Sequence, residues 1–154
     1  MCGVVGISLV PGAAIMTGAD QLARIGLQRL LHRGPDGHGV AGDRLSAVAM
    51  CRLRVRSQPS DQVPFSRTSE HLGTPEFFAY NGEVYTDGVG RIPKGGLDEA
   101  VAVAGDSNSQ PDGMYALVHR TMDGSIHVAR DPTPALLGVS ALPGHCGSRV
   151  PCVR

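Results

Sequence analysis

The chain of 154 residues has no tryptophan, and aromatic residues make up only 4% of it. Aromatic side chains supply much of the buried area in most cores, so aliphatic residues must fill this one. Neither sign of charge is in excess, since 14 basic residues balance 14 acidic ones. A nucleic-acid surface or a membrane-surface segment needs a basic excess or a basic run. We therefore expect neither nucleic acid nor a membrane as a partner.

Long hydrophobic runs are also missing. No apolar stretch approaches the ~20 residues needed to cross a bilayer. The first residues do not place a long apolar segment after a basic one, as a secretory signal would. We therefore expect a cytoplasmic protein. The length suffices for one domain with a core of its own.

Paired cysteines are absent as well, because Cys2, Cys51, Cys146 and Cys152 include no C-x-x-C pair. His145 stands beside Cys146, but two ligand types in one tail do not make a zinc site. The glycine-rich stretch 32–39 is not followed by Gly-Lys-Ser/Thr, which excludes a phosphate-binding P-loop. We expect no metal and no organic cofactor.

Hydrophobic periodicity predicts a mixed set of elements. Residues 3–10 form a short apolar, β-branched run, typical of a buried strand. Thr17 and Asp20 have capping-box spacing, and the apolar residues that follow predict an amphipathic helix to about His32. Residues 32–39, with three glycines and a proline, predict a structured turn. The remaining expectations are strands at 44–50, 77–80, 114–120 and 125–130, a short helix at 97–104, and loops at 57–75 and 105–112.

Cys2 carries the chemistry that the first residues suggest. Removal of Met1 would place a free α-amino group and a thiol on one residue. The amine, with a reference pKa of about 7.7–8.0, can then act as the base for its own nucleophile. The alternative is that Cys2 is only a small hydrophobic side chain.

Several short motifs, taken in order, resemble the glutaminase domain of class II glutamine amidotransferases, and the most similar branch is asparagine synthetase. The resemblance covers residues 1–138 and leaves 139–154 as an irregular tail. Its landmarks are Met1-Cys2-Gly3-Val4-Val5-Gly6, His32-Arg33-Gly34-Pro35-Asp36, Arg52-Leu53, Gln58-Pro59, Asn81-Gly82-Glu83-Val84-Tyr85, Gly113-Met114-Tyr115-Ala116 and Arg130-Asp131-Pro132.

The resemblance implies catalytic roles for three residues. Cys2 would attack the side-chain amide of L-glutamine and form a thioester. The Asn81 side chain and the Gly82 backbone N–H would hold the oxyanion. Asn-Gly alone is also a common hairpin turn, and that interpretation stays open.

It also implies substrate-binding roles for Arg52, Glu83 and Asp98. Arg52 would pair with the α-carboxylate of glutamine, because a guanidinium matches a carboxylate in two hydrogen bonds. Glu83 and Asp98 would receive the α-ammonium, with Asp106 as the competitor of Asp98. The alternatives are a surface arginine, an exposed strand charge and a plain helix cap.

The expected fold is α+β, an N-terminal nucleophile hydrolase-like αββα sandwich shortened at its C-terminal end. The Ser-Gly-Gly-x-Asp-Ser loop that accompanies ATP-dependent amide synthesis is absent from the sequence. We therefore expect ammonia to pass to a separate asparagine-synthetase-like partner. The alternative is a catalytically silent glutaminase-like module that binds or regulates such a partner.

Overall fold

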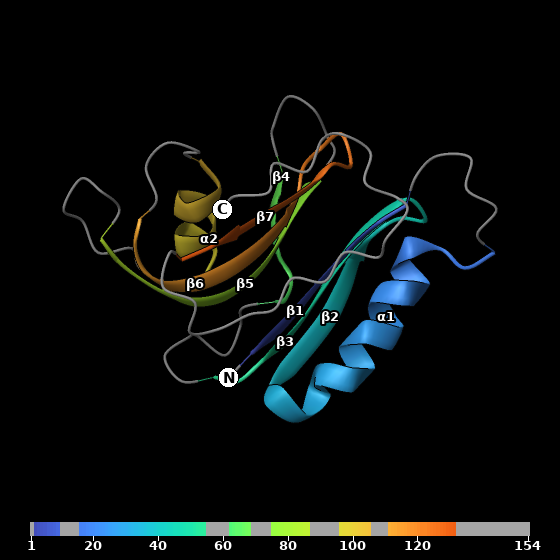
Figure 1. The fold of residues 1–154 in the computed structure, drawn as a ribbon, viewed down its shortest axis with the longest axis horizontal. Helices are drawn as coiled ribbons and strands as arrows, with labels where there is room; N and C mark the ends of the chain where they lie inside the picture. The colour runs from blue at the N-terminus through green and yellow to red at the C-terminus, as the bar shows by residue number, and fades with distance from the viewer. Residues whose placement is uncertain are drawn as a thin grey trace.

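The computed structural model describes residues 2–9, 16–54, 62–68, 75–86, 96–105 and 111–131 (Figure 1). Within these ranges the chain forms two helices and seven strands. The helices are α1 (Ala19–Leu30), continued by a 3-10 turn at Leu31–Arg33, and α2 (Leu97–Gly105). The strands are β1 (Gly3–Ser8), β2 (Gly37–Gly42), β3 (Ser46–Arg52), β4 (Phe65–Thr68), β5 (Pro75–Thr86), β6 (Asp112–Arg120) and β7 (Ile126–Arg130). Neither of the described helices has the length and apolar character to cross a membrane.

The strands form two antiparallel sheets. Sheet A has the order β1-β3-β2, and sheet B has the order β4-β5-β6-β7. Every strand pairing in both sheets is antiparallel. The predicted α+β class with two antiparallel sheets is therefore confirmed.

The elements lie in four layers. Helix α1 packs on sheet A, sheets A and B pack face to face, and α2 packs on β5 and β6 of sheet B (Figure 1). Strand β3 lies in the middle of sheet A, and all seven of its residues are buried. Ala47, Ala49 and Cys51 belong to the core under α1, whereas Val48 and Met50 belong to the core between the sheets. One strand thus supplies both cores, because alternate side chains point to opposite faces.

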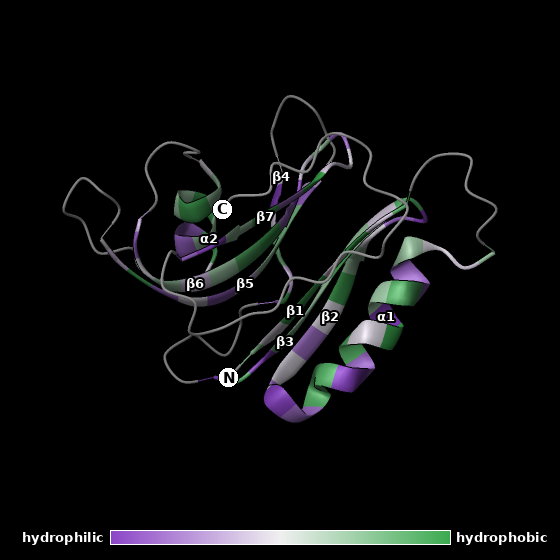
Figure 2. Cartoon of the chain, viewed as in Figure 1, coloured by the Kyte–Doolittle hydropathy of each residue, from purple (hydrophilic) through white to green (hydrophobic). Residues whose placement is uncertain are grey.

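Helix α1 buries a narrow stripe of small and aliphatic residues. Ala19, Ala23 and Leu27, spaced four apart, are buried against sheet A. Hydrophobic and hydrophilic residues alternate along this helix in Figure 2. The predicted capping box is wrong, because the N-cap is Gly18 and no side chain caps the helix. The backbone N–H of Ala19 instead donates to Arg44 O at 2.9 Å, which ties the helix start to the turn between β2 and β3.

Two strands lie where the sequence predicts turn or loop. Strand β2 occupies the second half of the glycine-rich stretch, and β4 lies inside the predicted loop 57–75. A Cβ on Gly39 would sit 2.0 Å from Val63 O, so β2 needs glycine to approach the chain just before β4. Glycine at position 39 allows close backbone contact between β2 and the residue that precedes β4. From the local sequence alone, such a glycine predicts a turn.

The other predicted elements are present with shifted ends. Strand β5 runs through Asn81-Gly82 without turning, so the hairpin interpretation of that dipeptide is wrong. Helix α2 and the β6–β7 hairpin are confirmed. In the hairpin, Gly124 has φ +84° and Asp123 accepts a hydrogen bond from Ser125 N at 3.1 Å.

Some predictions fall outside the described residues. These are the loop landmark Gln58-Pro59, the alternative ligand Asp106, the residues 132–138 and the tail 139–154. His145, Cys146 and Cys152 belong to that tail.

The two sheets are joined at one end by Arg120, which is buried. Its Nε donates to Ser46 Oγ at 2.9 Å and to Ser46 O at 3.1 Å. Its Nη2 donates to Asp43 Oδ2 at 2.5 Å. The backbone N–H of Ser46, together with Arg120, lowers the pKa of Asp43 below its ordinary value. Farther along, a Cβ on Gly6 would lie 2.4 Å from Val118 Cγ1, so the facing strands are in direct contact.

We predict that Gly6→Ala destabilises the fold by about 1–3 kcal/mol, the usual cost of overpacking a core. The cost should be smaller in a Val118→Ala background, because the methyl group that clashes is then gone. Urea unfolding of the four combinations measures this coupling. Gly105→Ala is the control, since a Cβ there meets nothing within 4 Å. Equal costs of Gly6→Ala in both backgrounds would contradict the packing.

The outer face of sheet B carries a polar cluster at its β4 side, in which Glu76 and His119 are buried and Arg67 is exposed. Arg67 donates through Nε and Nη2 to Glu76 Oε2, at 2.9 and 2.6 Å. His119 Nε2 lies 3.3 Å from Glu76 Oε1, and its ring stacks on Phe78 at 4.3 Å. Burial lowers the pKa of His119 below its ordinary value, although Glu76 opposes the shift.

We expect stability to fall with pH below about 6.5, because the unfolded chain then binds a proton that native His119 resists. The slope from this residue cannot exceed about 1.4 kcal/mol per pH unit. Thermal unfolding from about pH 7.5 to 5.5 measures it. His119→Phe keeps the ring stacked on Phe78 and should flatten the slope, whereas His127→Gln, at the exposed neighbour, should not. An unchanged slope in His119→Phe would refute the assignment.

Candidate functional site

Cys2 lies immediately before β1 and is half-buried. Its Sγ accepts a hydrogen bond from Leu53 N at 3.4 Å and lies 3.8 Å from Leu53 O. The antiparallel pairing of Gly3 with Cys51 explains this contact, since it sets Cys2 beside the end of β3. The first and third motifs of the sequence thus meet where Cys2 contacts Leu53, 51 residues away.

Arg52 is the last residue of β3 and is only 5% exposed. It is therefore not the surface arginine that was one alternative. Its guanidinium carbon lies 5.3 Å from the centre of the Phe65 ring, a cation–π contact between the two sheets. A buried guanidinium beside a half-buried thiol can receive an anionic group of a small ligand.

The turn Gly34-Pro35-Asp36 holds the end of β3 in place. A Cβ on Gly34 would lie 2.6 Å from the Arg52 backbone, so only glycine fits there. Asp36 N donates to Arg52 O at 3.0 Å, and Asp36 Oδ2 accepts from Arg54 N at 2.8 Å. The sequence marked this motif but assigned Asp36 no role. Its carboxylate bond across 18 residues has no local signal in the sequence.

Gly82 lies in the middle of β5 with φ +143°, a conformation that favours glycine. A Cβ would lie 2.0 Å from Met114 O and 2.5 Å from the Cα of Tyr115, its partner on β6. Any side chain here would push β5 and β6 apart. Gly82 therefore lets the β5 backbone sit directly against β6.

The pairing pattern fixes where the Gly82 backbone groups point. Both backbone groups of Tyr115 form hydrogen bonds on the β7 side. Its N–H donates to Asp131 Oδ2 at 2.9 Å, and its C=O accepts from Asp131 N at 3.0 Å. Antiparallel ladders alternate hydrogen-bonded and non-hydrogen-bonded pairs, so Gly82 and Tyr115 form a non-hydrogen-bonded pair. The Gly82 N–H accordingly points away from β6. Within the described residues, β4 pairs with β5 only at Pro75–Phe78 and does not reach this part of the β5 edge.

Two contacts show that β1 and β6 run in the same direction across the layer between the sheets. Gly6 lies against Val118. Two residues farther along each strand, Ser8 pairs with Ser46, and Ser46 contacts Arg120. The N-terminal ends of β1 and β6 therefore lie at the same end of the sandwich, opposite to Arg120.

Cys2, Arg52 and Asn81 belong to this one end of the inter-sheet layer. Cys2 packs against the core between the sheets. Arg52 has the strand parity of the β3 residues that point into that core. Asn81 has the parity of Ala79, the partner of Val118 on the inner face of sheet B. Separate stretches of the chain thus converge here.

Glu83 and Asp98 are placed differently. Glu83 shares the strand parity of Asn81, which puts it on the inner face of β5, and it is half-buried. Asp98 is the second residue of α2 and is exposed. The helix packs on the outer face of sheet B, where Glu99 accepts a hydrogen bond from Tyr80 Oη at 2.9 Å. Within the described part of the chain, no hydrogen bond or ion pair joins Asp98 to the other five residues.

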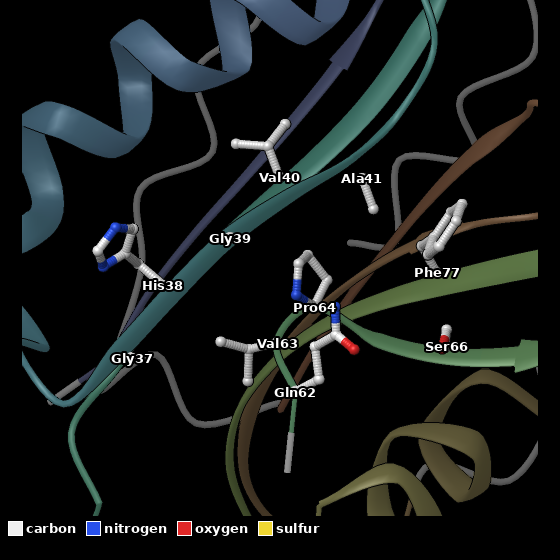
Figure 3. Close-up of a pocket in the computed structure, with 10 residues that line it drawn as sticks. All are labelled: Gly37, His38, Gly39, Val40, Ala41, Gln62, Val63, Pro64, Ser66 and Phe77. Atoms are coloured by element: carbon white, nitrogen blue, oxygen red, sulfur yellow. The ribbon is translucent and has the colours of Figure 1, made fainter. Parts of the chain in front are cut away.

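A pocket of about 300 Å³ opens between the edge strands β2 and β4 (Figure 3). Figure 3 shows His38 and Val40 on the α1 side of β2, and Ala41, Pro64 and Phe77 on the opposite side. None of the six predicted site residues lines this pocket. Its lining holds no charged residue. Among the described residues, no group of three or more His, Cys, Asp and Glu could hold a metal ion.

Comparisons of the chain with known protein families, with curated proteins and with solved structures gave no match. The site must therefore be interpreted from its own geometry.

We predict that an alkylating reagent modifies Cys2 in the native protein much faster than Cys51. Cys51 is fully buried, donates to Leu30 O at 3.0 Å, and has a pKa raised by burial. A thiol reacts as its thiolate, so both features protect it. Peptide mapping after iodoacetamide treatment gives the two rates, and the unfolded chain is the control in which they should converge. Native Cys51 reacting as fast as Cys2 would contradict the buried position.

Proposed function

We propose that the chain is a glutaminase of the class II amidotransferase type, which hydrolyses L-glutamine to glutamate and ammonia. The observation that carries the proposal is the contact of the Cys2 thiol with the residue after Arg52. This contact sets the thiol beside the end of β3, whose last residue is the buried Arg52. The Gly82 conformation supports the proposal, because it leaves a backbone N–H directed away from β6.

The fold supports the same proposal. A helix, two facing antiparallel sheets and a second helix are the layers of an N-terminal nucleophile hydrolase sandwich. Cys2 lies just before β1, in one of the two inner layers, which is where such a nucleophile belongs.

In the proposed reaction, Cys2 Sγ attacks the side-chain amide carbon of glutamine. The Asn81 side-chain amide and the Gly82 N–H stabilise the oxygen that becomes negative; removal of one such donor typically costs about 10²–10³ in kcat. The Cys2 α-amine takes the thiol proton and delivers it to the leaving nitrogen. The C–N bond breaks, ammonia leaves, and a thioester remains that water hydrolyses to glutamate.

Substrate selection in this proposal falls to Arg52, Glu83 and Asp98. Arg52 receives the α-carboxylate, which its burial near Phe65 would strengthen by excluding water. Glu83, on the inner face of β5, is placed better for the α-ammonium than the exposed Asp98. We propose that the ammonia passes to an asparagine-synthetase-like partner on a separate chain.

The test is glutamate release by the purified chain. We expect activity in wild type, loss in Cys2→Ala and retention in Cys51→Ala, which is the matched cysteine control. Arg52→Lys should raise KM for glutamine more than it lowers kcat, because it keeps the charge and loses the two-bond geometry.

The assay is run with and without candidate synthases, and intact mass reports whether Met1 is removed. Glutamate release that survives Cys2→Ala would sink the proposal. Absence of release in every mixture, with Met1 retained, would favour the silent binding module.

A further inference from the structure

We propose that Asp131 is a positioning residue for the oxyanion site, acting through Tyr115 on the Gly82 backbone. The inference rests on the proposed function for its catalytic consequence. The physical linkage itself is independent of the reaction.

At the last pair between β6 and β7, the side chain of Asp131 accepts a hydrogen bond that a backbone carbonyl would accept in a regular ladder. Its backbone N–H donates to Tyr115 O at 3.0 Å, as a regular ladder would require. The return bond goes from Tyr115 N to the carboxylate Oδ2 at 2.9 Å, and not to a backbone carbonyl. Tyr115 is thus held by both of its backbone groups. The rung lies just past the end of β7, where the main-chain ladder stops.

This carboxylate is retained against a cost. Asp131 is 3% exposed, and its Oδ1 is buried without a hydrogen-bond donor among the described residues. Burial of a carboxylate oxygen without a donor is unfavourable, because the oxygen loses its hydrogen bonds to water. The unfavourable burial of Asp131 must be offset by a favourable interaction. The hydrogen bond from Tyr115 N to Asp131 Oδ2 is such an interaction.

Tyr115 passes that constraint to Gly82. The two residues face each other across β5 and β6, and the Gly82 Cα has no side chain to separate them. No hydrogen bond of their own fixes the pair, because the backbone groups of Tyr115 are engaged with Asp131. The flanking pairs Asn81–Ala116 and Glu83–Met114 carry the ladder hydrogen bonds on either side of Gly82. Between them, Gly82 is positioned by contact with Tyr115, and both backbone groups of Tyr115 are held by Asp131.

The effect of Asp131 on catalysis is expected in the transition state. The Gly82 N–H is aimed at an oxygen that becomes charged only during attack by Cys2. A small displacement of this donor should lower kcat and leave KM nearly unchanged, the pattern of an interaction made only in the transition state. A misplacement of about 1 Å can cost on the order of 10²-fold.

The experiment compares Asp131→Asn with Asp131→Glu in the full chain. Asn keeps an acceptor for Tyr115 N–H at the same reach and loses the charge, whereas Glu keeps the charge and moves the acceptor. We expect Asn to retain kcat within a few-fold, and Glu to lose on the order of ten- to a hundredfold in kcat with KM unchanged. The same two substitutions at Asp43 are the matched control. That carboxylate also accepts backbone N–H groups, from Leu45 and Ser46, but at the opposite end of the sandwich.

A second readout needs no activity. In ¹⁵N-labelled protein, the Gly82 and Tyr115 amides should shift and exchange faster in Asp131→Glu, and stay close to wild type in Asp131→Asn and in both Asp43 variants. Equal loss of kcat in Asn and Glu, or a Gly82 amide unmoved in Asp131→Glu, overturns the inference. If wild type releases no glutamate, the proposed function fails, and the amide readout alone still decides whether Asp131 positions Gly82.

Discussion

Strand β3 is the constraint on which the rest of the structure depends, because both of its faces are buried. One face receives α1, and the other receives sheet B, so the strand has no side left for water. A strand in this position must be apolar throughout, and its only charged residue comes at the end, as Arg52. Because β3 is buried along its length, its terminal Arg52 places a guanidinium at the edge of the layer between the sheets. That edge is also where β1 begins, since β1 is the antiparallel neighbour of β3 and Cys2 precedes it.

Close backbone contact is the second feature that shapes the molecule. Gly6, Gly34, Gly39 and Gly82 each sit where a Cβ would collide with a neighbouring segment. Phe65, Phe78, Tyr80 and Tyr115 are buried, but the core under α1 holds no aromatic side chain and is built from small and aliphatic residues. Close approach of the layers increases the dispersion contacts between them. At each of these glycines a larger side chain would not fit. Two of these contacts, at Gly34 and Gly82, lie at the end that holds the candidate site.

The two ends of the sandwich have different chemistry. At one end Arg120, Asp43 and Ser46 satisfy one another and join the sheets. At the other end Cys2, Arg52 and the inner face of β5 bring together a thiol, a buried cation and a backbone edge. The proposed glutamine hydrolysis is argued from this grouping and from the glycine-dependent backbone at Gly82.

The sequence by itself determined the class of fold and most of the elements. Periodic apolar residues specified α1, the composition of residues 97–104 specified α2, and Asp123-Gly124 specified the last hairpin, because these patterns depend only on residues close in the chain. Tertiary structure decided the rest. Strands β2 and β4 form by pairing with β3 and β5, and Asn81-Gly82 stays extended because it pairs with β6. Likewise, Asp36 and Asp131 act through bonds to residues 18 and 16 positions away. Local patterns cannot specify such bonds, because the partner is set by strand register and not by sequence distance.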